Sequence, residues 1–320
     1  KYDFTTLLDR RGKDSIAADL IPWEGKPDPG VSVIPMWVAD MSFPTAPPIL
    51  EAIRARLEMP NFGYFRLPDS YFDAIVRWQR RRNGVQSLTP ADIGYSGFTH
   101  TLNDLGRKIV HSPLRRDEAG VWRMDYEDMD AQLKAHHIHL AILCSPHNPC
   151  GRVWERRELE KAMEVYAAND CYVISDEIWS DIILPGHRHI PTQSVSDDAR
   201  QRTIAFYAPS KTFSLAGLIG SYHIIYNSYL RDRVRRVSGS THYNDCNVLS
   251  LHALLGAYSE AGEEWVDEMR QVIDENCRYA CEFIAAHFPG VRVMRPQGTY
   301  MLFLDCAGYC AEHGISITEL

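Results

Sequence analysis

The chain has 320 residues, of which 45% are apolar, and this is enough for a sizeable core in one large or two modest domains. Its formal net charge of -8 argues against a basic surface that binds nucleic acid. No apolar run approaches membrane-spanning length and the first residues lack a signal-peptide core, so we expect a cytoplasmic protein that binds no membrane.

The eight cysteines include no Cys-x-x-Cys pair, which predicts free thiols in a reducing compartment. One basic cluster, Arg77 with Arg80–Arg82, follows an amphipathic stretch. A solvated helix face is the favoured interpretation of this cluster, and a phosphate site is the alternative.

The predicted elements alternate along most of the chain. The first 48 residues are rich in Pro, Gly and Trp and are predicted to be irregular. Periodicity then predicts helices over 49–58, 70–82, 155–169, 247–257 and 263–288, and strands over 140–144, 171–175, 203–207, 221–226, 291–294 and 299–304. Apolar strands separated by helices predict an α/β fold, with a mostly parallel sheet covered on both faces.

Polar side chains follow three successive strands of this predicted sheet. Asn148 lies in a Pro- and Gly-containing stretch after the first strand, Asp176 follows the second, and Lys211 follows the third. Ligands of open α/β sheets bind outside the carboxyl ends of the strands, so the three side chains are expected on one rim. Taken singly, each residue has a simpler interpretation as a turn, a helix N-cap or a surface lysine. Together they favour a site.

Lysine, aspartate and asparagine suit one cofactor in particular. A lysine amine can form an imine with an aldehyde. An aspartate can keep a pyridine nitrogen protonated, and an asparagine amide can donate to a ring oxygen. These are the groups that pyridoxal 5'-phosphate (PLP) requires.

The motifs around these residues resemble those of the fold-type I PLP enzymes of the aminotransferase class I/II family. The resemblance covers nearly the whole chain and rests on the motifs 147–151, 175–178 and 210–213, with 296–300 and 304–305 in a smaller domain. Within that family, the segment 35–44 (Pro-Met-Trp-Val-Ala-Asp-Met-Ser-Phe-Pro) is most similar to that of cystathionine β-lyase-type carbon–sulfur lyases.

The resemblance implies a role for each matching residue. Lys211 would hold the cofactor and move protons, Asp176 would pair with the pyridinium nitrogen, and Asn148 would bind the ring oxygen O3'. The remaining residues are Ser210 and Tyr64 on the phosphate, Trp179 in the place of a tyrosine that donates to O3' in many relatives, and Ala39 and Asp40 near the substrate carboxylate.

The resemblance also implies a domain division and an assembly. We expect a large PLP-binding domain over 49–246, with a seven-stranded type of sheet, and a smaller α+β domain formed by 1–48 and 247–320. Because Tyr64 corresponds to a residue that reaches the neighbouring subunit's cofactor phosphate, we expect a homodimer.

The sequence departs from the family pattern in four ways, of which the third concerns two residues. Between Gly94 and Gly97 the family has a few dozen more residues, which carry a phosphate-binding helix start and an aromatic that stacks on the cofactor ring. We favour the interpretation that these residues are missing from the sequence above, rather than truly deleted from the protein. The sequence also ends before the arginine that holds the substrate carboxylate. The other departures are Ala208 and Ile219, in place of phosphate-binding residues, and Trp179.

The favoured function is a PLP-dependent carbon–sulfur β-lyase acting on cystathionine or S-substituted cysteines. The alternatives are an aminotransferase and a non-catalytic regulatory or binding protein. A metal site at the histidines of 136–139 or at His187 and His189 is disfavoured, because no carboxylate or cysteine cluster accompanies them.

Overall fold

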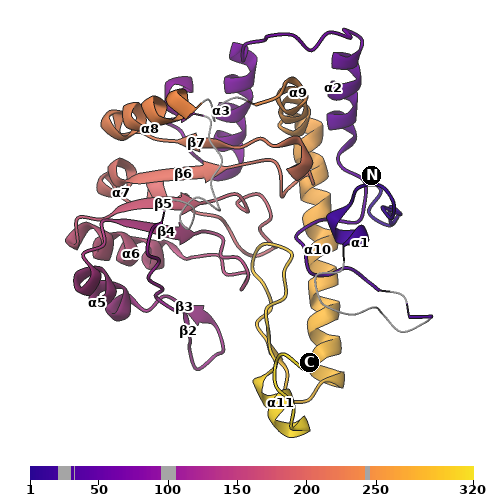
Figure 1. The fold of residues 1–320 in the computed structure, drawn as a ribbon, viewed down its shortest axis with the longest axis vertical. Coiled ribbons are helices and arrows are strands. Elements are labelled where there is room, and N and C mark those ends of the chain that lie inside the picture. Colours follow the sequence, from indigo (N-terminus) through magenta and orange to yellow (C-terminus); the bar gives the residue numbers. More distant parts are fainter. Residues whose placement is uncertain (21–29, 32, 95–105, 242–245) are drawn as a thin grey trace.

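The computed structural model describes residues 1–20, 30–31, 33–94, 106–241 and 246–320 (Figure 1). The sequence analysis infers a missing segment between residues 94 and 97, and of these residues the structure describes only Gly94. The predicted alternation of helices and strands is present, and most element bounds lie within a few residues of those expected. The strand expected over 299–304 is wrong in its extent, because Thr299 has a φ of +65° and the only strand that the structure describes there is β9 (Leu304–Asp305).

A five-stranded sheet in the order β1-β7-β6-β5-β4 forms the centre of the described structure. β4, β5 and β6 are parallel, as predicted, whereas β7 is antiparallel to both β6 and β1. The strands of this sheet are β1 (Ile93–Gly94), β4 (Leu140–Cys144), β5 (Tyr172–Asp176), β6 (Thr203–Tyr207) and β7 (Tyr222–Ile224).

The two faces of the sheet differ in burial. Side chains alternate between the two faces along each strand, and the register places one set of them on the same face. This set includes Leu143, Val173 and Ala205, and all three are buried. On the other side, Ile142 is 45% exposed and Tyr172 is 37% exposed. The described residues therefore bury most of one face and leave part of the other open, whereas the sequence predicts cover on both.

The helices begin and end at residues suited to those positions. Pro47 lies in the first turn of α2, and the left-handed Gly84 ends α3. The side chain of Asn247 accepts a hydrogen bond from the Ser250 N–H at the start of α9. The helices are α1 (Ile16–Asp19), α2 (Pro47–Leu57), α3 (Asp69–Asn83), α5 (Tyr126–His136), α6 (Arg156–Ala168), α7 (Asp197–Arg202), α8 (Ser228–Thr241), α9 (Val248–Ala257), α10 (Glu260–His287) and α11 (Ala307–His313), with 3-10 turns η1 (Pro90–Asp92), η2 (Thr192–Ser194) and η3 (Ala216–Leu218).

Two hydrophobic cores lie against the sheet. The larger core joins α3, α9 and the first half of α10 to β6 and β7, and its largest buried side chains include Trp179 and Trp265. The smaller core joins α5 and α6 to β4 and β5 around Trp154. The larger core draws residues from both halves of the domain division that the sequence suggests, so that division remains a prediction.

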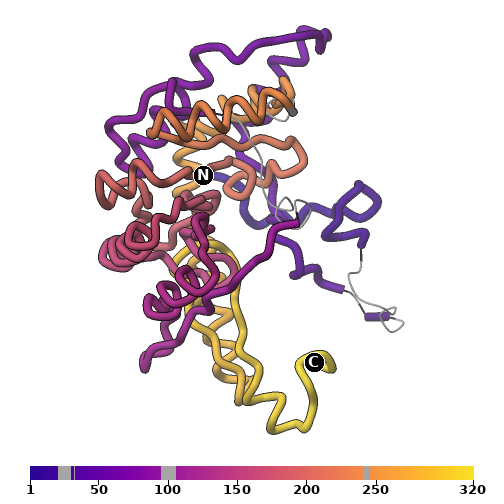
Figure 2. Tube along the Cα trace, turned by 60° about the vertical axis from the view of Figure 1, so that its left-hand side comes forward, coloured from indigo at the N-terminus to yellow at the C-terminus, as the bar shows by residue number. Residues whose placement is uncertain are grey.

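The two ends of the described chain meet the long helix α10. The Tyr2 hydroxyl donates to the Ala261 carbonyl near the start of that helix, over 3.0 Å. After α10 come the short strands β8 (Arg292–Val293) and β9 (Leu304–Asp305), and Figure 2 shows this C-terminal segment projecting away from the sheet. A further two-stranded ribbon, β2 (Arg115–Arg116) and β3 (Trp122–Arg123), precedes α5.

Three further expectations can be compared with the structure. All eight cysteines are free, as predicted. Arg81 and Arg82 of the basic cluster form ion pairs with Glu263 and Asp267 of α10, which supports a solvated face rather than a phosphate site. None of the helices in the described ranges combines the length and the apolar composition that a membrane span requires.

Candidate active site

The parallel strands end in register, and this brings the predicted residues to one edge of the sheet. Cys144 at the end of β4 is opposite Asp176 at the end of β5, and Asp176 is opposite Phe206 of β6. Lys211 follows β6 by four residues, in a turn closed by the hydrogen bond from the Leu215 N–H to the Ser210 carbonyl at 2.9 Å. The expectation of a shared rim is therefore confirmed for the backbone.

Asp176 has one oxygen committed to the protein. Its Oδ1 accepts a hydrogen bond from the Ile178 N–H at 3.2 Å, and its Oδ2 receives none from the residues that the structure describes. Burial raises the pKa of this carboxyl group, and the nearby positive charge of Lys211 opposes the rise. The half-buried carboxylate therefore retains an oxygen that can accept a bond from a ligand.

Lys211 lies beside an aromatic wall. Its Nζ is 5.7 Å from the ring centre of Trp179, a side chain that is itself buried. The next residue, Thr212, donates from its hydroxyl to Asp181 Oδ2 at 3.3 Å, and the Trp78 indole N–H donates to Asp181 Oδ1 at 3.0 Å. The turn that carries the lysine is thereby fixed to the buried core, while the lysine side chain is only half-buried.

Asn148 lies in the turn after β4. The Ser145 N–H donates to the Asp176 carbonyl at 2.9 Å, and the Asn148 N–H donates to the Cys144 sulfur at 3.4 Å. The Asn148 side chain is exposed, and its amide forms no hydrogen bond within the described part of the chain. The turn therefore presents an uncommitted amide next to the strand that ends at Asp176.

A strap of residues 296–300 crosses from the C-terminal part of the chain to this turn. The Gln297 N–H donates to the Gly151 carbonyl at 2.8 Å. Gly151 has a φ of +70°, and a Cβ at this position would lie 2.6 Å from the Pro296 Cβ, so only glycine fits. The strap ends at Tyr300, whose ring meets the Trp179 ring edge-on with centroids 4.9 Å apart.

The N-terminal segment reaches the same region. Ala39 packs against the larger core, and Asp40 forms an ion pair with Arg10. Burial raises the pKa of the Tyr300 hydroxyl, and the Asp40 charge raises it further. Thr45 donates to the Phe213 carbonyl at 2.6 Å, two residues after Lys211. Ala39 and Asp40 therefore lie on the side of the site where Tyr300 lies, and their substrate role stays a prediction.

Two predicted residues are not joined to the others by side-chain contacts. Tyr64, between α2 and α3, is fully exposed and so contacts none of the strand-end side chains. This is the arrangement expected if Tyr64 acts in a neighbouring subunit, and that role stays a prediction. Ser210 is half-buried beside Lys211, and its contact with a phosphate also stays a prediction.

A buried polar cluster behind the site was missed by sequence reasoning. Glu177 is completely buried, and its Oε1 accepts from the Ser175 hydroxyl and the Thr192 N–H, each at 3.0 Å. Its Oε2 accepts from His189 Nε2 at 2.7 Å and from the Tyr207 hydroxyl at 2.6 Å. Burial is the main cause that raises the pKa of the Tyr207 hydroxyl well above its ordinary value, and the Glu177 charge is the next. The hydroxyl therefore stays protonated and acts as a donor.

The one available sequence signal for this cluster was an acidic residue directly after Asp176, at the end of an apolar strand. His189, considered above as a weak metal candidate, is occupied by Glu177. In the described ranges of the chain, no group of three or more histidine, cysteine and acidic side chains is arranged to hold a metal ion.

The family model of aminotransferase class I and II matches residues 86–319. The chain belongs to this family. It is 36% identical to cystathionine beta-lyase PatB of Bacillus subtilis, over 90% of this chain and 80% of that protein. It is 30% identical to protein MalY of Escherichia coli, over 95% of this chain and 84% of MalY.

Solved structures agree with this membership. Cystalysin from Treponema denticola, which contains PLP, superposes with a TM-score of 0.87 at 29% identity, over 95% of this chain and 84% of that chain. The PLP-bound carbon–sulfur lyase from Staphylococcus hominis gives a TM-score of 0.87 at 28% identity, over 99% of this chain and 85% of that chain. The fold-type I architecture that the motifs imply is therefore confirmed.

The residues at the rim fit PLP by their chemistry. Asp176 has a carboxylate oxygen available for a pyridinium N–H, and Lys211 supplies a primary amine. The uncommitted Asn148 amide can donate to a ring oxygen. The described residues thus supply three groups that the ring would contact. The family's phosphate-binding helix start, expected near 94–97, lies outside the described residues.

Proposed function

We propose that this chain is a PLP-dependent carbon–sulfur β-lyase that cleaves cystathionine or related S-substituted cysteines. The observation that carries the proposal is the Lys211 amine and the uncommitted Asp176 oxygen at one sheet edge, beside the Trp179 ring. The relatives named above support the lyase activity, because they include a cystathionine beta-lyase and a PLP-bound carbon–sulfur lyase.

PLP, when bound, supplies a positively charged ring that withdraws electrons from the substrate carbon next to the amino group. Asp176 would keep the ring nitrogen protonated by holding a negative charge against it. Asn148 would orient the ring through its amide. The Trp179 ring forms one wall of the space beside Lys211, and its burial in the larger core fixes that wall.

Lys211 would act as the base of the reaction. Its free amine removes the proton from the substrate's α-carbon, and the electron pair left behind forms the double bond to the β-carbon as the C–S bond breaks. The sulfur leaves as a thiolate, which takes a proton to give the thiol. The released enamine reacts with water to give pyruvate and ammonia, so the atoms balance without an oxidant.

Three further assignments belong to the same proposal. Ala39 and Asp40 would lie near the substrate carboxylate, on the side of the site marked by Tyr300. Tyr64 and Ser210 would contact the cofactor phosphate, with Tyr64 donated by the second chain of a homodimer, which agrees with its full exposure. The eight free thiols support a reducing compartment such as the cytoplasm.

The test is pyruvate formation from L-cystathionine by the PLP-loaded protein, compared between Lys211→Ala and Lys134→Ala. Lys134 is an exposed lysine of α5 that pairs with Asp130, away from the residues assigned to the site, so its removal is the matched control. We expect Lys211→Ala to lower kcat/KM by at least about 10³-fold, whereas Lys134→Ala keeps the wild-type value. Borohydride treatment of the wild type should attach the cofactor to the peptide that contains Lys211.

Two other outcomes would overturn the lyase proposal. Transfer of the amino group to a 2-oxo acid without release of pyruvate would identify an aminotransferase. A protein that takes up no PLP and turns over no amino acid would be a regulatory or binding protein on the same fold.

A further inference from the structure

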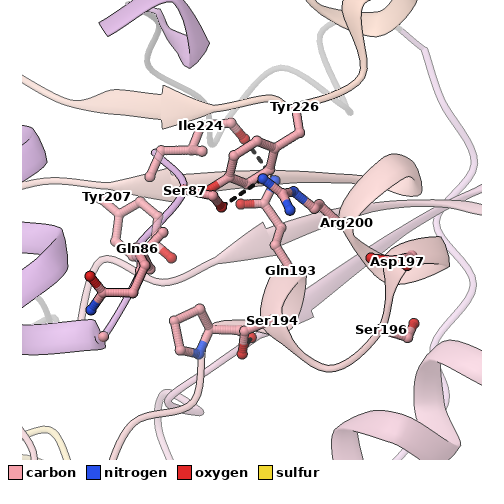
Figure 3. A pocket seen from close by; sticks show the side chains of 13 residues that line it. Gln86, Ser87, Gln193, Ser194, Ser196, Asp197, Arg200, Tyr207, Ile224 and Tyr226 are labelled. Carbon is pink, nitrogen blue, oxygen red and sulfur yellow. Dashed lines mark hydrogen bonds between the residues drawn. The ribbon is translucent and has the colours of Figure 1, made fainter. Parts of the chain in front are cut away.

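A cavity lies away from the residues assigned to the cofactor and the substrate. Its volume is about 490 Å³, and none of the predicted site residues lines it. It is enclosed by the end of α3, the segment from η2 to α7, and the sheet strands β6 and β7 (Figure 3). The residues that line it are Gly84, Val85, Gln86, Ser87, Pro191, Gln193, Ser194, Ser196, Asp197, Arg200, Tyr207, Ile224 and Tyr226.

Arg200 is the cation of this cavity. Its Nη2 donates to the Ser87 hydroxyl at 2.6 Å, and its guanidinium carbon lies 4.1 Å from the ring centre of Tyr226. Figure 3 shows Arg200 extending from α7 towards Ser87 across the Tyr226 ring. The guanidinium is therefore oriented by a hydroxyl and an aromatic face, and several of its N–H donors remain available.

The charge of Arg200 is not neutralised inside the protein. Among the residues that the structure describes, no carboxylate forms an ion pair with Arg200, although Asp197 lies one helical turn before it. Arg202 of the same helix, by contrast, holds Asp198 with two hydrogen bonds. A half-buried arginine that lines a cavity without a carboxylate partner is suited to bind an anion from solution.

The walls of the cavity are held in place before any ligand arrives. The Gln193 amide donates to the carbonyls of Thr203 and Ile224, each at 2.9 Å, and this fastens η2 to two strands. The Ser194 hydroxyl donates to the Pro191 carbonyl at 2.7 Å. A preformed wall lowers the entropy cost of binding.

The surface beside Arg200 is mixed, with polar and apolar parts of similar extent. Gln193, Ser194 and Ser196 are among its polar residues, and the half-buried Tyr226 ring lies under the guanidinium. The volume is within the range of small-molecule sites, and one oriented cation beside an aromatic ring gives such a ligand a charged and an apolar contact. A ligand that matches both parts would carry an oxyanion at one end and an apolar body at the other.

We propose that this cavity binds a small organic carboxylate, with its oxygens on the Arg200 guanidinium, which Ser87 orients, and its body beside the Tyr226 ring. The site is separate from the PLP site and does not depend on the lyase assignment. It is a binding site for a metabolite-sized acid.

The test uses 4-bromobenzoate as the probe, with the PLP-loaded full chain. Its carboxylate fits Arg200, and its bromine gives an anomalous signal that locates it in a crystal. Titration calorimetry would compare wild type with Arg200→Gln and with Arg157→Gln, which removes the same charge from an exposed position outside the cavity. We expect the bromine signal in the cavity, a Kd raised at least about tenfold by Arg200→Gln, and no change with Arg157→Gln.

A second variant covers the case in which Arg200→Gln fails to fold. Ser87→Ala removes one hydroxyl and should raise the Kd about three- to tenfold. Equal affinity in wild type and in the folded cavity variants would overturn the proposal, as would a bromine signal elsewhere or no binding in solution. Inorganic phosphate is the second probe: Arg200-dependent binding of phosphate without binding of 4-bromobenzoate would overturn the organic carboxylate.

Discussion

Asp176 and Glu177 are neighbouring acids at the end of the same strand, and their surroundings are opposite. Asp176 is half-buried, accepts one backbone hydrogen bond and keeps one oxygen uncommitted within the described structure. Glu177 is fully buried, and four donors from three separate segments satisfy its two oxygens. The first carboxylate is arranged to meet a ligand, whereas the second is arranged to hold the protein together.

The difference shows how a functional acid can be told from a structural one when both lie beside a site. Successive residues of an extended chain point in opposite directions, so one acid can face a ligand while its neighbour faces the interior. The deciding property is the number of protein donors that each carboxylate has already accepted. This comparison makes separate predictions for activity and for stability.

The largest expected effect is the loss of activity in Asp176→Asn. Asparagine keeps the shape and can still accept the Ile178 N–H, but it carries no charge for the cofactor nitrogen. We expect kcat/KM for pyruvate formation to fall by about 10²- to 10³-fold, with a free energy of unfolding of the cofactor-free protein within about 1 kcal/mol of wild type. An unchanged kcat/KM would show that Asp176 does not meet the ring.

The next effect is a loss of stability in Glu177→Gln. The amide has one acceptor oxygen in place of two, so some of the donors at Ser175, Thr192, His189 and Tyr207 lose their partner in a buried site. We expect the free energy of unfolding of the cofactor-free protein to fall by about 2 to 4 kcal/mol, measured by urea denaturation.

The matched control for this variant is Glu160→Gln, on the partly exposed side of α6, which should change the free energy of unfolding by less than about 0.5 kcal/mol. Equal stability of Glu177→Gln and wild type would mean that the buried cluster does not stabilise the fold.

The smallest effect is a dependence on pH. Burial raises the pKa of Asp176 in the folded protein above its ordinary value of 3.8, so the proton binds more tightly to the folded state. The stability from this group is therefore fully present below pH 3.8 and is lost as the pH rises through the raised pKa. Since the side chain of asparagine does not titrate, the Asp176→Asn variant should gain stability relative to wild type as the pH rises through that window.

Urea denaturation of the two cofactor-free proteins across the acid range would measure this difference. A gap that is constant with pH, or a loss of stability by the variant relative to wild type as the pH rises, would contradict the assigned direction of the pKa shift.

The sequence predicted the rim well because its information is local. Each of Asn148, Asp176 and Lys211 follows its own strand, and a parallel sheet brings such strand ends together. The direction of β7 was not predictable in this way, because an apolar run such as 221–226 has the same pattern in either orientation. The partners of Glu177 lie up to thirty residues away along the chain, so no local pattern could reveal them. The role of Tyr64 depends on a second chain.

The strap and the long helix together determine how firmly the wall of the site is held. The buried residues of α10 end at Cys277, and at 1.5 Å per residue the rest of the helix extends about 15 Å beyond the core. The segment that follows returns to the body of the protein where Gln297 and Gly298 bond to Gly151. The C-terminal part is also fixed further along, where Asp305 forms an ion pair with Arg116 and the Phe303 ring lies 5.7 Å from the Trp122 ring. Tyr300 lies between these two attachments, so its aromatic contact with Trp179 is held from both sides and the wall of the site behaves as a part of the body of the protein.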